Sequence, residues 1–80
     1  MIISSHARQE MQHSNITEEE VAQCLAHGEL VIKQLRQGEL RYGKELTLKE
    51  RKIVAIYTFQ EDEERIITAY EIRRKKQWLP

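Results

Sequence analysis

The chain changes from a helical to an extended hydrophobic pattern near residue 28. Before that point apolar residues recur three or four positions apart, as Val21, Cys24 and Leu25 do, which is typical of one face of a helix. From Leu30 onward they alternate or run together, which is typical of strands. The extended segments cover 30–36, 40–48, 52–59 and 65–72. The pattern therefore predicts two helices followed by four strands.

The second helix has the clearer boundary signals. Thr17 can cap its start, and Glu20, three residues later, can bind the Thr17 amide in return, as in a capping box. Ile16 and Val21 have the spacing of a hydrophobic staple across the same boundary. Gly28 is expected to end this helix in a left-handed conformation.

The first helix is shorter. Ser4 or Ser5 can cap it, and Ala7 and Met11 lie one turn apart on a face that we expect to be buried. The helix is expected to stop near Asn15, because asparagine tolerates a left-handed backbone better than most residues other than glycine. Only about two residues then separate the helices, so we expect them to form a hairpin.

The extended segments are joined by short loops, which favours antiparallel neighbours. Segment 52–59, KIVAIYTF, is apolar at odd and even positions alike, so we expect it to be the central strand, buried on both faces. Gly43 within 40–48 predicts a bulge or a close approach of the backbone. We therefore expect a single α+β domain over residues 1–80, with a helical hairpin before a four-stranded antiparallel sheet. Which face of the sheet the helices cover stays open.

The charge balance limits the classes of partner. The 13 basic and 13 acidic residues give a formal net charge of zero, so no overall field attracts nucleic acid or a membrane surface. Residues 41–80 nevertheless hold ten basic and seven acidic groups, which leaves room for a local basic patch. Cys24 has no second cysteine to pair with, and no apolar run is long enough to span a bilayer. We expect a soluble cytoplasmic protein with no membrane partner and no DNA partner.

His6 is the first candidate for chemistry. In the first turn of a helix the dipole favours neutral imidazole, which could act as a general base or lie beside a bound phosphate. The simpler interpretation, which we favour, is a histidine that caps or packs the helix. His6, Glu10 and His13 also share one helical face, but the two histidines lie about 10 Å apart along the axis, too far for one ion. We expect a solvated face there, and no metal or cofactor.

Basic residues and tyrosines lie close together in the second half of the chain. Basic side chains beside exposed aromatic rings can follow a phosphate backbone and stack on bases. The alternative, which the charge balance favours, is that the tyrosines belong to the core and that the charges protect the strand edges. The candidate RNA-binding residues are Arg41, Lys44, Lys49, Arg51, Lys52 and Arg74.

Trp78 and Leu79 are two large apolar residues that follow a run of four basic residues, 73–76. Such side chains in a charged tail either cover one end of the sheet or anchor a protein partner. Trp78 and Leu79 are therefore the candidate partner-binding residues.

The pair His6-Ala7, Met11 and the segment Ile16–Val21 together resemble a bacterial domain-of-unknown-function family, DUF4258. Its members typically read His-Ala, two residues, Arg-Met, then Arg-Gly-Ile and an acidic run that ends in Val. In this chain Glu10 stands at the first Arg position and Ser14-Asn15 replaces Arg-Gly, so two cationic positions are missing. The family is similar in element order to the BrnT-type toxins and, more distantly, to the RelE-like ribonucleases.

The resemblance implies a RelE- or BrnT-like fold and leads to two hypotheses for the function. One is a metal-independent ribonuclease that would use Tyr42, Tyr70 and Arg73, with His6 as a base, and whose partners would be RNA and an antitoxin-like protein. The other is a non-catalytic module that binds a protein partner or a second copy of itself. We favour the second hypothesis, because the charge balance and the two missing Arg positions weaken the case for RNA.

Overall fold

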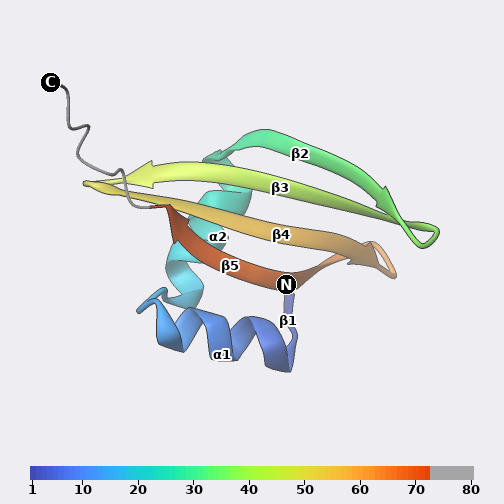
Figure 1. The fold of residues 1–80 in the computed structure, drawn as a ribbon, viewed down its shortest axis with the longest axis horizontal. Helices are drawn as coiled ribbons and strands as arrows, with labels where there is room; N and C mark the ends of the chain where they lie inside the picture. Colours follow the sequence, from blue (N-terminus) through green and yellow to red (C-terminus); the bar gives the residue numbers. More distant parts are fainter. Residues whose placement is uncertain (73–80) are drawn as a thin grey trace, which may run out of the picture.

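The protein is an α+β structure in which two helices lie on one face of a five-stranded mixed sheet (Figure 1). The computed structural model describes residues 1–72. Neither helix in this part of the chain has the length and hydropathy needed to cross a membrane. The strand order is β1-β5-β4-β3-β2, and β2 to β5 form the predicted antiparallel meander. The elements are β1 (Ile2–Ile3), α1 (Ser5–His13), α2 (Glu18–His27), β2 (Glu29–Arg36), β3 (Glu39–Leu48), β4 (Arg51–Gln60) and β5 (Glu63–Ile72).

The prediction of four antiparallel strands was wrong in one respect, because β1 adds a fifth strand parallel to β5. Ile2 pairs with Arg65 and Ile3 with Ile66, and the Ser4 amide donates to the Ile66 carbonyl at 3.2 Å. A strand of two residues is too short to show an alternating pattern. Its partner is also the last strand of the described chain, so no local signal indicates the pairing.

Both helices begin where the capping pattern predicts. Ser4 Oγ accepts a hydrogen bond from the Ala7 amide at 3.1 Å. Thr17 Oγ1 accepts from the Glu20 amide at 3.1 Å, and Glu20 Oε1 accepts from the Thr17 amide at 2.9 Å, which completes the capping box. Asn15 has a φ of 54°, which confirms the left-handed residue predicted after the first helix.

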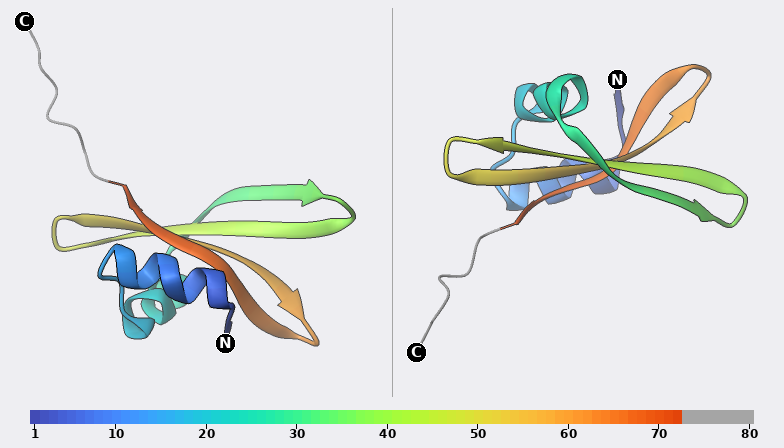
Figure 2. Two further views of the ribbon diagram at one scale, coloured as in Figure 1. Left: turned by 60° about the horizontal axis from the view of Figure 1, so that its bottom comes forward. Right: turned by 90° about the horizontal axis from the view of Figure 1, so that it is seen from above.

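The helices leave the predicted path at two points. Gly28 is extended, with φ −73° and ψ 163°, because the chain passes directly into β2 at Glu29. Glycine is required there for space, since a Cβ atom would lie 2.3 Å from the Cys24 carbonyl oxygen and 2.9 Å from that of Glu45. The helices also cross steeply instead of forming a hairpin (Figures 1 and 2). The reason is that each packs on the sheet, α1 on β5 and α2 on β4 and β3.

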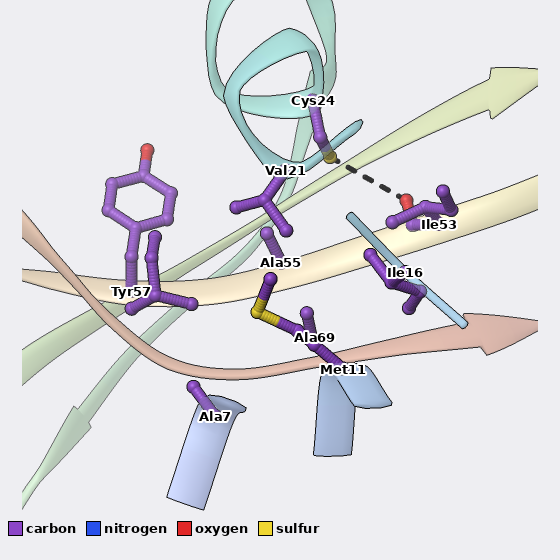
Figure 3. Packing of buried hydrophobic residues seen from close by; sticks show 10 residues of the cluster. Ala7, Met11, Ile16, Val21, Cys24, Ile53, Ala55, Tyr57 and Ala69 are labelled. Atoms are coloured by element: carbon purple, nitrogen blue, oxygen red, sulfur yellow. Dashed lines mark hydrogen bonds between the residues drawn. The ribbon is translucent and has the colours of Figure 1, made fainter. Parts of the chain in front are cut away.

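The core lies between the helices and one face of the sheet, which we name the helix face. Figure 3 shows Ala7, Val21 and Cys24 pointing from the helices toward the central strands. β4 is the central strand, as predicted, and it also buries Val54, 2% exposed, on the opposite face. The buried cluster consists of Ala7, Met11, Ile16, Val21, Cys24, Ile53, Ala55, Tyr57, Ile66 and Ala69.

Gly43 marks a close approach of side chains to the backbone, in agreement with its interpretation from the sequence. A Cβ atom on Gly43 would lie 2.9 Å from side-chain atoms of both Ile32 and Ile56, which reach over it from the two neighbouring strands. The bulge itself belongs to β2, between Leu30 and Ile32. It leaves Val31 without a partner in β3.

Arg51, at the start of β4, ties the turn between the helices to the sheet. Its Nη2 donates to the Ser14 carbonyl at 2.9 Å, and its Nη1 donates to the Asn15 carbonyl at 3.2 Å. The guanidinium also forms ion pairs with Glu20 at 3.2 Å and Glu71 at 3.1 Å. One side chain therefore connects the inter-helix turn, α2, β4 and β5.

Candidate functional site

The two hairpins of the sheet separate toward their turns. β3 and β4 pair only as far as Tyr42 and Tyr57; beyond them β3 pairs with β2 and β4 pairs with β5. Viewed from above, the two turns diverge (Figure 2, right). Where the β3–β4 ladder stops, Thr58 Oγ1 donates to the Leu40 carbonyl at 2.7 Å, so a side chain joins the hairpins at that point.

An open cleft of about 450 Å³ lies between the two hairpins. The rings of Tyr42 and Tyr57 stack with their centroids 5.6 Å apart, and Phe59 meets both edge-on at 5.7 and 5.8 Å. Burial raises the pKa of Tyr57, and the nearby Glu64 carboxylate adds to the effect, so this phenol stays neutral at physiological pH. The cleft is lined by Gly38, Glu39, Leu40, Tyr42, Thr58 and Phe59.

Three large apolar side chains beside this cleft are exposed to solvent. Leu35 is 68% exposed, Leu40 43% and Phe59 55%. Leu35 and Leu40 pair across β2 and β3, and the alternation of β3 places them on the helix face with Tyr42. Phe59 lies on the same face, because its ring contacts Tyr42. We name Leu35, Leu40, Tyr42 and Phe59 the distal patch.

The distal patch is uncovered because the helices are shorter than the strands. α1 has nine residues and α2 has ten, so each is about 15 Å long. β3, β4 and β5 have ten residues each and extend for about 33 Å. Figure 1 shows both hairpin turns reaching beyond the helices. The sequence analysis missed Leu35, Leu40 and Phe59, although the predicted lengths of helices and strands contained this signal.

The two hairpins carry opposite charge. The turn end of the β2–β3 hairpin, residues 33–41, is mostly basic, and the one acidic residue in this range, Glu39, forms an ion pair with Arg41 at 3.0 Å. The β4–β5 turn is acidic. A surface that contacts both hairpins would therefore meet an apolar centre with positive charge on one side and negative charge on the other. The charged residues are Lys33, Arg36, Glu39 and Arg41 near the turn of the first hairpin, and Glu61, Asp62, Glu63 and Glu64 around the second turn.

The predicted catalytic residues are not brought together by the described part of the chain. Tyr42 is half-buried on the helix face, whereas Tyr70 pairs with Val54 and is 37% exposed on the opposite face. His6 is exposed in the first turn of α1. Arg73 lies outside the described residues. The two tyrosines therefore project from opposite sides of the sheet.

The predicted RNA-binding residues are divided between the two ends of the sheet. Arg41 lies in the β2–β3 hairpin, and Lys49, eight residues later in the β3–β4 turn, is about 27 Å away along the strand. Of the others, Lys44 donates to the Leu25 carbonyl at 2.7 Å, Arg51 makes the contacts described above, and Lys52 pairs with Glu45 at 3.7 Å. Arg74, and the predicted partner-binding residues Trp78 and Leu79, lie outside the described residues.

Cys24 is a core residue. Its thiol donates to the Lys44 carbonyl at 3.2 Å. It also donates to the Ile53 carbonyl at 3.6 Å, the contact drawn in Figure 3. Burial raises the pKa of this thiol, which keeps it protonated and therefore weakly nucleophilic. Within residues 1–72, no three His, Cys, Asp or Glu side chains lie close enough together to hold a metal ion.

The model of one protein family matches residues 3–71, a span that includes both helices and nearly all of the described sheet. This family is described as a domain of unknown function (DUF4258). The chain belongs to the DUF4258 family. The capping box of α2, the Arg51 contacts and the distal patch all lie within the matched DUF4258 region. No curated protein and no solved structure matches the chain.

Proposed function

We propose that this DUF4258 domain is a non-catalytic protein-interaction module and that the distal patch is its contact surface. The supporting observation is the exposure of Leu35, Leu40 and Phe59 together on one surface. A contiguous apolar surface in water is typical of a site that another protein covers. Aromatic side chains such as Phe59 and Tyr42 often contribute much of the binding free energy at such sites.

The surroundings of the distal patch favour a protein over RNA as the partner. RNA binding would need a continuous basic surface, but an acidic turn, Glu61 to Glu64, flanks the patch on one side. A protein partner would present an apolar ridge with charges of both signs beside it. An antitoxin-like protein or a second copy of the chain would meet this description.

The ribonuclease hypothesis has less support. A single site built from both Tyr42 and Tyr70 would need them on one surface, and they lie on opposite faces of the sheet. Lys44 and Arg51 also direct their charged groups to carbonyl oxygens inside the protein. The relation to BrnT- and RelE-like toxins stays a prediction, as does the cytoplasmic location.

The proposal is tested by comparing two variants of the tagged protein in affinity purification from the cells that produce it. Leu35→Ser/Phe59→Ser disrupts the distal patch, whereas Ile72→Ser removes an apolar side chain, 44% exposed, away from it. We expect a protein partner that the patch variant loses and the control retains. That partner, purified separately, should bind the patch variant at least about tenfold more weakly than the wild type in calorimetry.

Equal affinity for the wild type and the patch variant would overturn the proposal. RNA cleavage provides the second test, measured with and without ribosomes. Cleavage by the wild type that falls in Tyr70→Phe would replace the interaction module with the ribonuclease. Absence of cleavage from folded protein would agree with the proposal.

A further inference from the structure

We infer that the outer edge of β2 pairs with β2 of a second copy of this chain, antiparallel, so that two sheets become one. The inference rests on the proposed interaction function and names its partner. β2 has eight residues, whereas β1, the other outer strand of the described sheet, has two. Leu30 and Val31 in β2 are 50% and 44% exposed, in addition to Leu35 of the distal patch. Long, exposed, apolar edge strands are sites of pairing with another chain.

The bulge in β2 decides which of its side chains share a face. Leu30 and Leu35 pair with even-numbered residues of β3 and therefore lie on the helix face. Glu29 and Arg36 pair with odd-numbered residues of β3 and lie on the opposite face. In a regular strand of the same sequence, without the bulge, the members of each pair would point to different faces, because they are an odd number of residues apart. The bulge therefore places a leucine on the helix face, and a charged side chain on the opposite face, in each half of β2.

A two-fold axis perpendicular to the sheet at Lys33 pairs residues of matching chemistry. Because Val31 has no ladder position of its own, Glu29 and Arg36 are equally far from Lys33 along the ladder. The axis therefore places Glu29 opposite Arg36 of the second copy on one face of the joined sheet. It places Leu30 opposite Leu35 of the second copy on the helix face. Each pair occurs twice by symmetry, and such an axis keeps the faces of the two copies aligned. Opposite charges and apolar side chains directly across two strands both stabilise antiparallel pairing.

Lys33 supplies the one unfavourable contact of this arrangement. It lies on the axis, so it faces Lys33 of the second copy, and like charges directly across two strands are destabilising. A lysine and a bulge are also features that limit the pairing of exposed strand edges. The dimer is therefore a reversible one, whose population depends on concentration within the range of sedimentation experiments.

Sedimentation velocity of the full chain over a range of concentrations tests the inference. The wild type should shift with concentration from 9.6 kDa toward twice that mass. Glu29→Arg and Arg36→Glu should each raise the dimer dissociation constant about tenfold, because each places two pairs of like charges across the interface. The double variant, and an equimolar mixture of the two single variants, should recover the dimer. Lys33→Thr should lower the dissociation constant.

Glu50→Arg, in the β3–β4 turn, makes the same charge change away from β2 and should leave the dimer unchanged. Far-UV circular dichroism confirms that each variant keeps its fold. A monomer at every concentration, or a dimer that the charge reversals do not weaken, would overturn the inference. If the protein is a monomer but a different protein binds the distal patch, this inference fails and the proposed function stands.

Discussion

Replacing Arg51 should detach the inter-helix turn from the sheet and lower the stability of the whole domain. We choose Arg51→Met, because methionine keeps an apolar stem of similar length and removes only the guanidinium. The variant loses the hydrogen bonds to the Ser14 and Asn15 carbonyls and the ion pairs with Glu20 and Glu71. These contacts hold the end of α1 and the start of α2 against β4 and β5.

The expected loss can be estimated contact by contact. Each hydrogen bond from Arg51 to a backbone carbonyl contributes about 1 kcal/mol to the free energy of unfolding. Each ion pair contributes at most about 0.5 kcal/mol, because the side chains are 28% exposed for Arg51 and 25% and 15% for its partners, so water screens them. The sum is about 2–3 kcal/mol. For a domain of this size, a loss of that magnitude lowers the melting temperature by about 10 °C or more.

Urea denaturation followed by far-UV circular dichroism measures this loss. Lys49→Met is the matched control, since Lys49 is exposed in the adjacent turn and its loss should change the free energy of unfolding by less than about 0.5 kcal/mol. An Arg51→Met protein as stable as this control would refute the reasoning. Equal losses from Arg51→Met and Arg51→Lys would show that guanidinium geometry, and not charge alone, holds the turn.

Three further predictions concern the glycines, a turn and the buried thiol. Gly28→Ala should lower the free energy of unfolding by about 3 kcal/mol, because the new Cβ would meet two carbonyl oxygens. Gly38→Ala should lower it by only about 1 kcal/mol, because Gly38 has a φ of 78° but open space around it. Equal losses for the two variants in urea denaturation would contradict this. Asp62→Gly should raise the free energy of unfolding by about 0.5–1 kcal/mol, because Asp62 has a φ of 65° in a two-residue hairpin turn that favours glycine. Lower stability of the variant in thermal unfolding would count against this. Cys24 should react with iodoacetamide at pH 8 far more slowly in the native protein than in urea, as followed by mass spectrometry, and equal rates would contradict its burial. Burial raises the pKa of Cys24 above its ordinary value of 9.0. The contribution of the protonated thiol to the free energy of unfolding is therefore complete below pH 9.0 and is lost as the pH rises toward the pKa of the native thiol.

Local signals of the sequence predicted the helices well. The Thr17–Glu20 capping box and the left-handed Asn15 depend on residues three or fewer positions apart, and both are confirmed. Gly28 was misinterpreted because two properties favour glycine, conformational freedom and small size. Its small size is needed because its extended backbone brings the Cys24 carbonyl close, and because the backbone of β3 lies beside it; the local sequence indicates neither.

The candidate site was harder to predict, because it depends on the register between strands. In β5 both Ile66 and Ala69 belong to the buried cluster on the helix face, although one position is even and the other odd. The shift in the β4–β5 pairing next to Ile56 and Tyr57 causes this change of parity. A regular alternation along 65–72 therefore could not reveal that Tyr70 lies on the face opposite Tyr42.

Photo-crosslinking from the distal patch tests the interaction function most directly. A photoreactive amino acid is placed at position 35 or, as a control, at position 49, in cells that naturally produce the protein. Our account predicts protein adducts from position 35, where Leu35 is the most exposed large apolar side chain of the described residues, and none from position 49. Equal adducts from both positions, or adducts to RNA in place of protein at position 35, would contradict it.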